Sequence, residues 1–91
     1  MRDKIVIFYA AHARKDLSKL EKHLAKKIVL KIRQFAESSD PLRMAQPPPG
    51  IGSGLYRYRI GDYRAIFEID NGGNISILTV LHVQHRKDVY R

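Results

Sequence analysis

The chain of 91 residues contains no cysteine. This absence excludes a disulfide framework and a zinc site built from thiolates. The four histidines, at positions 12, 23, 82 and 85, lack the carboxylate clustering of a metal centre, and a strand would point His82 and His85 to opposite sides. The sequence therefore predicts no metal site and no small-molecule cofactor.

Long hydrophobic runs are also missing. No apolar segment approaches the ~20 residues that a helix needs to cross a bilayer. Met1-Arg2-Asp3-Lys4 leads into only five apolar residues, which is too few for the core of a signal peptide. We expect a cytoplasmic protein without a membrane partner.

Acidic residues are scarce, because 9 Asp and Glu stand against 17 Lys and Arg, for a formal net charge of +8. Such an excess favours a polyanionic partner such as nucleic acid. Hydrophobic residues make up 44% of the chain, which suits one compact core but not two at this length. We expect residues 1–91 to form a single domain.

Proline is absent from most of the chain, since all four prolines fall within residues 40–54, which we interpret as a surface loop. Before this loop, apolar residues recur at the three- and four-residue steps of a helix stripe: Leu17, Leu20, Leu24, Ile28, Ile32 and Phe35. One helix over 11–37 would be ~40 Å long, whereas a domain of this size has a radius of gyration of only ~12 Å. We therefore expect a helical hairpin with a turn near Glu21 to His23.

Two apolar segments, one before the helical region and one near the end of the chain, predict strands. Ile5 to Tyr9 is β-branched and aromatic, which is typical of a strand. Residues 75–83 are apolar at both alternating sets of positions. We expect that second strand to be central in the sheet and covered on both faces for much of its length.

A hairpin is predicted between these strands, where residues 55–60 and 63–69 flank the turn Gly61-Asp62. A second turn at 70–74 leads into the strand at 75–83. The predicted fold class is α+β, with an N-terminal strand, a helical hairpin and a three-stranded antiparallel meander. Together the strands form a four-stranded twisted sheet with the helices on one face.

The first strand of this hairpin separates two kinds of side chain. Tyr56, Tyr58 and Ile60 lie on one face, and Arg57 and Arg59 lie on the other. The apolar set is the natural partner of the helix stripe, so the arginines face away from the helices. They are either solvated charges on an exposed face or a phosphate-binding surface with forked donors.

Arg64 follows the turn and also has two interpretations. It forms a salt bridge to Glu68 or Asp62, or it lies beside Arg57 or Arg59. Like charges side by side cost stability unless an anion fills the gap. Three arginines within eight residues favour the second interpretation slightly.

The segment from His82 to Arg91 is polar and basic directly after an apolar strand. It is typical of a frayed basic tail. Val89-Tyr90 is unusually apolar for such a tail, and the tyrosine can instead pack on the sheet or stack against a base. The spacing leaves both alternatives open.

Two motifs carry a resemblance to a known family. The pattern R-x-R-x-G-D-Y-R at residues 57–64 and the pattern H-R-K-D-x-Y at residues 85–90 resemble the RelE/ParE toxin superfamily of toxin–antitoxin systems. The resemblance extends over essentially the whole chain. It implies a microbial RNase fold, with a twisted antiparallel sheet on a helical hairpin.

For the RelE branch, the resemblance implies a metal-independent ribonuclease that cuts messenger RNA in the ribosomal A site. The ribose 2′-hydroxyl attacks the adjacent phosphate and leaves a 2′,3′-cyclic phosphate. The resemblance assigns catalysis and RNA binding to particular residues. The catalytic set is Arg59, Arg64, Arg86 and Tyr90, and the RNA-binding set is Arg57, Arg59 and Lys87.

The general base is left open by this assignment. The best-known RelE pattern has lysines where Arg57 and Arg59 stand, and a guanidinium with a pKa above about 12 is a poor base. His82 and His85 are minor acid–base candidates because imidazole titrates near neutral pH.

Two rival functions use the same fold. One is a ParE-type toxin that acts on DNA gyrase, and the other is a degenerate member that binds only its antitoxin or nucleic acid. The resemblance implies a cognate antitoxin, messenger RNA and the ribosome as partners.

Overall fold

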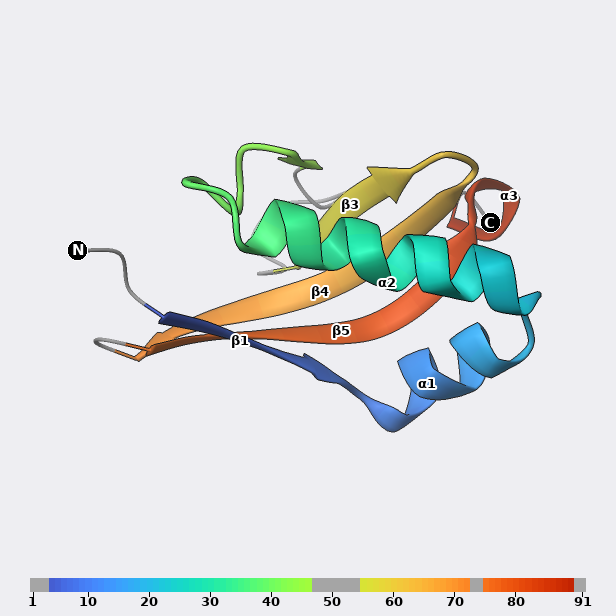
Figure 1. Ribbon diagram of the computed structural model, residues 1–91, viewed down its shortest axis with the longest axis horizontal. Helices are drawn as coiled ribbons and strands as arrows, with labels where there is room; N and C mark the ends of the chain where they lie inside the picture. Colours follow the sequence, from blue (N-terminus) through green and yellow to red (C-terminus); the bar gives the residue numbers. More distant parts are fainter. Residues whose placement is uncertain (1–3, 47–54, 73–74, 90–91) are drawn as a thin grey trace.

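A computed structural model gives the structure of residues 4–46, 55–72 and 75–89. This part of the chain forms one five-stranded sheet with helices packed against it. The strands are β1 (Lys4–Tyr9), β2 (Ala45–Gln46), β3 (Tyr56–Ile60), β4 (Tyr63–Gly72) and β5 (Ile75–His85). The predicted α+β class is confirmed (Figure 1).

The strand order across the sheet is β1-β5-β4-β3-β2. Two details add to the expected four-stranded sheet, for which the family resemblance implied antiparallel strands. First, β1 runs parallel to β5, which is possible because the chain between them is long: it passes through both helices and through β2, β3 and β4 before it enters β5 from the end at which β1 begins. Second, β2 adds a fifth strand within the expected loop by pairing with Arg57 and Tyr58. A pairing of two residues leaves no alternating pattern in the sequence.

Two helices follow β1 directly: α1 (Ala11–Ser18) and α2 (Lys22–Ala36). The break between them spans residues 19–21, two residues earlier than the predicted turn. A third helix, α3 (Arg86–Val89), follows β5. Within the described part of the chain, no helix has the length and apolar character needed to cross a membrane.

The core lies between α2 and one face of the sheet, as the helix stripe predicted. Ile28 and Ile32 of α2 are fully buried, and so are Tyr58 of β3 and Phe67 of β4. The Tyr58 ring lies 4.4 Å from the Phe67 ring and 5.1 Å from that of Phe35, measured between ring centroids. Aromatic packing therefore fixes which face of β3 turns toward the helix.

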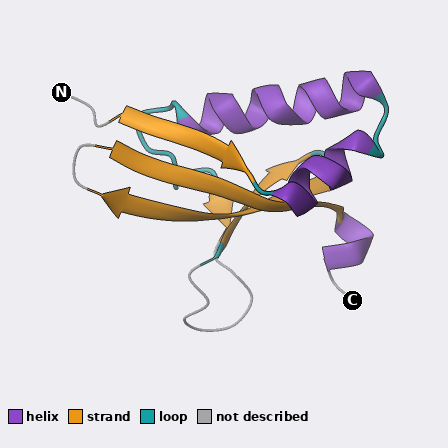
Figure 2. Cartoon of the chain, turned by 90° about the horizontal axis from the view of Figure 1, so that it is seen from below, coloured by secondary structure: helices purple, strands orange, loops and turns teal. Residues whose placement is uncertain are grey.

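The opposite face of the sheet is exposed at the end where β5 begins. Ile75 is 47% exposed and Ile77 is 38% exposed, whereas Leu78 and Val80 of the same strand are fully buried. The expectation that this strand is covered on both faces was therefore wrong for these two residues. Figure 2 shows the reason, because α2 covers one face only and α3 lies on the other side near the opposite end.

Tyr58 joins the core to the segment that follows α2. Its hydroxyl donates a hydrogen bond to the Pro41 carbonyl oxygen at 2.7 Å. Burial, with a further contribution from the charge of Asp40, raises the pKa of Tyr58 to about 12. The folded protein thus holds this proton at a pH where the unfolded chain releases it.

Replacing Tyr58 by phenylalanine tests this coupling. The variant loses the hydrogen bond to Pro41, and we expect its free energy of unfolding to fall by about 1 kcal/mol at neutral pH. The stability that the neutral phenol supplies is fully present below the unfolded pKa of 10.0 and is lost as the pH rises through about 12. Urea unfolding should therefore show that the free energy of unfolding falls less between about pH 8 and about pH 11 in the variant than in the wild-type protein. Equal losses in both proteins contradict the coupling.

Candidate functional site

Two rows of side chains cross the face of β3, β4 and β5 that α2 leaves uncovered. In the first row, Arg59 pairs with Arg64, which pairs with Gln84. Paired residues on neighbouring strands project from the same face of a sheet. The alternate residues Tyr58 and Ala65 are buried under α2, so this row points away from the helix.

The second row lies two residue pairs further along the strands, which is the next pair on the same face. It consists of Arg57, Ile66 and His82. We call the two rows together the cationic face. Its members are Arg57, Arg59, Arg64, Ile66, His82 and Gln84.

Arg64 is the most constrained cation of this face. It is only 4% exposed, and its Nη1 donates to the carbonyl oxygens of Gly61 at 3.0 Å and Tyr63 at 2.9 Å. Its Nε is buried and has no acceptor within the described part of the structure. A buried donor without an acceptor costs about 1–3 kcal/mol, so the site stores a cost that an anion can relieve.

The position of Arg64 decides between its two interpretations. The strand register places Arg64 directly opposite Arg59. The Arg64 Nη1 hydrogen bonds go to backbone carbonyls rather than to Asp62 or Glu68. Arg59 itself is exposed. Two arginines are therefore paired directly across the hairpin, one buried and one exposed, which is an arrangement that favours a bound anion.

Arg57 anchors the edge of the cationic face. Its Nε donates to Oε1 of Gln46 on β2 at 3.1 Å. The short strand β2 thus restrains the arginine that lies two residue pairs from Arg59 and Arg64 on the same face. Held side chains lose less conformational entropy when they bind a ligand.

The residues after β5 form helix α3 up to Val89, so this stretch is not a frayed tail. The Arg86 backbone N–H donates to the Asp62 carbonyl oxygen at 2.7 Å, and Arg86 Nε lies 3.8 Å from Asp62 Oδ1. Lys87 is exposed beside it. Tyr90, the other candidate of this segment, lies outside the described residues.

The Gly61-Asp62 turn therefore holds two of the candidate arginines. Arg64 binds the Gly61 carbonyl and Arg86 binds Asp62. Gly61 has a φ of 60°, a left-handed conformation that glycine adopts without strain. This turn links the hairpin to α3 and brings the two motifs of the sequence together.

The two histidine candidates have different surroundings. His85 pairs with Tyr63, on the face that α2 covers, and the two rings meet edge to face at 5.2 Å. His82 belongs to the cationic face, but its Nδ1 lies 3.0 Å from Nδ1 of His12 on α1. The two imidazole rings therefore contact Tyr63 and His12, and not Arg59 or Arg64.

The structure also brings together side chains that the sequence kept apart. His12, Asp16 and His82 have their ligand atoms within 4.8 Å of one another. The expectation that the histidines lack the carboxylate clustering of a metal centre was therefore wrong for His12 and His82. The i,i+4 spacing of His12 and Asp16 on one helix face was the available signal, while the contact with His82 depends on the fold.

Gln84 and Ile66 complete the cationic face, and neither was predicted from the sequence to be a site residue. Their signal was strand alternation, because both share the side of their strand with a candidate residue. The side-chain amide of Gln84 offers both a donor and an acceptor beside Arg64. Ile66 adds an apolar surface between Arg57 and His82.

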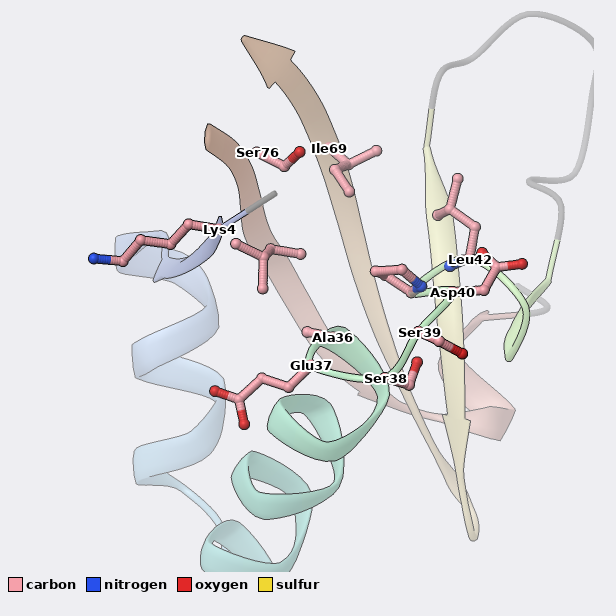
Figure 3. Close-up of a pocket in the computed structure, with 11 residues that line it drawn as sticks. Lys4, Ala36, Glu37, Ser38, Ser39, Asp40, Leu42, Ile69 and Ser76 are labelled. Atoms are coloured by element: carbon pink, nitrogen blue, oxygen red, sulfur yellow. Dashed lines mark hydrogen bonds between the residues drawn. The ribbon is translucent and has the colours of Figure 1, made fainter. Parts of the chain in front are cut away.

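A pocket of about 510 Å³ lies away from the cationic face, between the end of α2 and the start of β1 (Figure 3). Lys4, Glu37 and Asp40 contribute charge of both signs to its lining. Two carboxylates disfavour a phosphate ligand there. The arginines of the cationic face instead lie on the neighbouring strands β3 and β4, with Arg59 exposed and Arg64 buried, an arrangement that suits the backbone of a polymer.

Comparison with known proteins gives three kinds of match. The family model described as ParE toxin of type II toxin-antitoxin system, parDE, matches residues 7–90. The curated protein Toxin RelG from Mycobacterium tuberculosis is 33% identical over 86 residues, covering 91% of this chain and 92% of that protein.

Solved structures match with a similar extent. The toxin-antitoxin complex RelBE2 from Mycobacterium tuberculosis has a chain that is 28% identical, with a TM-score of 0.70 and 94% of each chain covered. The RelB-RelE antitoxin-toxin complex from Methanococcus jannaschii has a chain that is 27% identical, with a TM-score of 0.60, covering 91% of this chain and 94% of that chain.

Proposed function

The chain belongs to the ParE toxin family of type II toxin–antitoxin systems, within the RelE/ParE superfamily. We propose that this toxin is an endoribonuclease that cleaves messenger RNA on the ribosome. The observation that carries the proposal is the buried Arg64, whose Nε has no acceptor in the described structure and which faces Arg59 across the hairpin. Preformed guanidinium donors that lack an anion are suited to a phosphate whose charge grows during reaction.

The proposed reaction needs no redox partner. The ribose 2′-oxygen loses its proton to water and attacks the adjacent phosphorus, the bond from phosphorus to the 5′-oxygen breaks, and the departing 5′-oxygen takes up a proton from water. The products are a 2′,3′-cyclic phosphate and a 5′-hydroxyl end. The phosphorane formed on the way carries more negative charge than the ground state, so fixed cations accelerate the step.

The candidate residues divide this work between them. Arg64 stabilises the phosphorane, and Arg57 and Arg59 hold the RNA backbone. Arg86 neutralises the leaving 5′-oxygen, and Lys87 adds charge along the RNA path. Tyr90 is proposed to stack on the nucleotide, as an aromatic side chain does with an unpaired base.

The arginines are not assigned the removal of the 2′-proton, because a guanidinium with a pKa above about 12 holds its own proton too firmly. The two histidines are not assigned it either. His85 lies on the helix-covered side of its strand, and His82 turns its Nδ1 toward α1. The proposed catalysis thus depends mainly on electrostatic stabilisation.

A cognate antitoxin is the proposed protein partner, since two similar chains were solved in complexes with antitoxins. An acidic or amphipathic segment of such a partner fits the cationic face by charge. Messenger RNA and the ribosome are the proposed targets, which sets the proposed activity in the cytoplasm.

Inhibition of DNA gyrase is the second candidate function, because the matching family model carries the ParE name. Primer extension on RNA from cells that express the toxin separates the two. Cleavage within translated codons is expected, and mutation of the start codon of the same message should abolish it. Intact messages, together with inhibited supercoiling by purified gyrase, contradict the ribonuclease and support the gyrase inhibitor.

A further inference from the structure

A second cluster of side chains lies where α1 meets β5. His12 and Asp16 lie one turn apart on α1, and His12 Nδ1 is 3.2 Å from Asp16 Oδ2. His82 of β5 brings its Nδ1 to 3.0 Å from His12 Nδ1. We propose that His12, Asp16 and His82 bind one divalent transition-metal ion of the zinc class, which fastens α1 to β5.

The hydrogen-bonding pattern is the first argument. The single proton that neutral imidazole can carry on His12 Nδ1 points at one acceptor, but this nitrogen has two neighbours at contact distance. If it donates to the carboxylate of Asp16, it offers no proton in line with His82 Nδ1. A cation between the three atoms removes the conflict, because each ligand atom then directs a lone pair at it.

The distances form the second argument. Zinc binds nitrogen and oxygen ligands at about 2.0–2.2 Å, and a tetrahedron with such bonds has edges of about 3.3 Å. The separations of 3.0 Å and 3.2 Å nearly match two of these edges. The third separation, between the ligand atoms of Asp16 and His82, is below 4.8 Å, and ion binding would draw these two side chains together to form the remaining edge.

The backbone around the cluster supplies the third argument. β1 pairs with β5 only as far as Tyr9 and Val80. Beyond that point, the Val83 N–H donates to Asp16 Oδ2 at 3.0 Å. A carboxylate oriented by a fixed donor is the outer support that metal ligands usually have.

The cluster is open on one side. The His12 side chain is 60% exposed, whereas that of Asp16 is only 17% exposed. Water can therefore enter as a fourth ligand, so the site can fill without unfolding α1. The bound ion would tie His82, a member of the cationic face, to the helix at the sheet edge.

Metal binding is tested on the untagged, full-length protein after treatment with a chelator. Calorimetric titration with zinc chloride should show one equivalent bound, and cobalt(II) should give the visible absorption of a tetrahedral site. Since a ligand that binds only the folded state stabilises it, the melting temperature should rise by about 5 °C or more at saturating zinc.

Variants locate the ion. His12→Ala and His82→Ala should lower zinc affinity at least about 10-fold. Asp16→Asn should also weaken binding, while it keeps an oxygen that can accept from the Val83 N–H. The matched control is His23→Ala, an exposed histidine of α2 outside the cluster.

Three results overturn the proposal. They are no zinc binding to the folded wild-type protein, unchanged affinity in both His12→Ala and His82→Ala, and an equal loss in His23→Ala. Because these readouts use binding and melting, their outcome is independent of whether the toxin cleaves RNA.

Discussion

Arg64→Gln is expected to lower the rate of message cleavage about 10²–10³-fold while the protein stays folded. The guanidinium of Arg64 is held by the carbonyls of Gly61 and Tyr63 and is almost fully buried. It therefore needs no rearrangement when charge develops on the phosphorane. Glutamine is shorter than arginine but keeps a polar donor, and it carries no charge.

Stability should change little in this variant. Loss of the two backbone hydrogen bonds lowers the free energy of unfolding, but removal of a cation opposite Arg59 raises it. Urea unfolding distinguishes this outcome from collapse of the fold. Single-turnover cleavage on programmed ribosomes measures the chemical step separately from binding.

The matched control is Arg43→Gln, which removes an exposed arginine outside the cationic face. It should cleave at the wild-type rate. Wild-type cleavage by Arg64→Gln contradicts the assignment of Arg64 to the transition state. An equal loss in Arg43→Gln shows that total charge, rather than the position of Arg64, controls the rate.

The place of Arg64 beside Arg59 was accessible from the sequence because a two-residue turn fixes the register of a hairpin. Once Gly61-Asp62 is the turn, the residues that follow must pair back in order. The burial of Arg64 was not accessible, since it depends on the surroundings of the whole strand end. No alternation of polar and apolar residues distinguishes a buried arginine from an exposed one.

The helix stripe and the core face of β3 were also predicted correctly, because both follow from local periodicity. The features that escaped depend on contacts between distant segments. His12 and His82 are 70 residues apart, and β2 exists only because β3 offers it an edge. Helix α3 likewise begins where Arg86 meets the hairpin turn.

Arg86→Ala is expected to slow cleavage about 10²-fold, through a role that differs from that of Arg64. The side chain of Arg86 is 55% exposed and lies 3.8 Å from Asp62 Oδ1. Its backbone is bound to the same turn that holds Arg64. This geometry sets a second, solvent-facing cation near the candidate reaction site, where it can neutralise a departing oxygen.

A change of leaving group separates the two roles. In a message with sulfur in place of the bridging 5′-oxygen at the cleavage site, the leaving thiol has a pKa near about 8.5 and departs without help. Arg86→Ala should then approach the wild-type rate, whereas Arg64→Gln should remain slow, because the phosphorane still needs its charge stabilised. Asp62→Asn, which removes the carboxylate charge beside Arg86, should show a weaker defect that the sulfur substrate also repairs. If the sulfur substrate leaves Arg86→Ala as slow as before, Arg86 does not act on the leaving group.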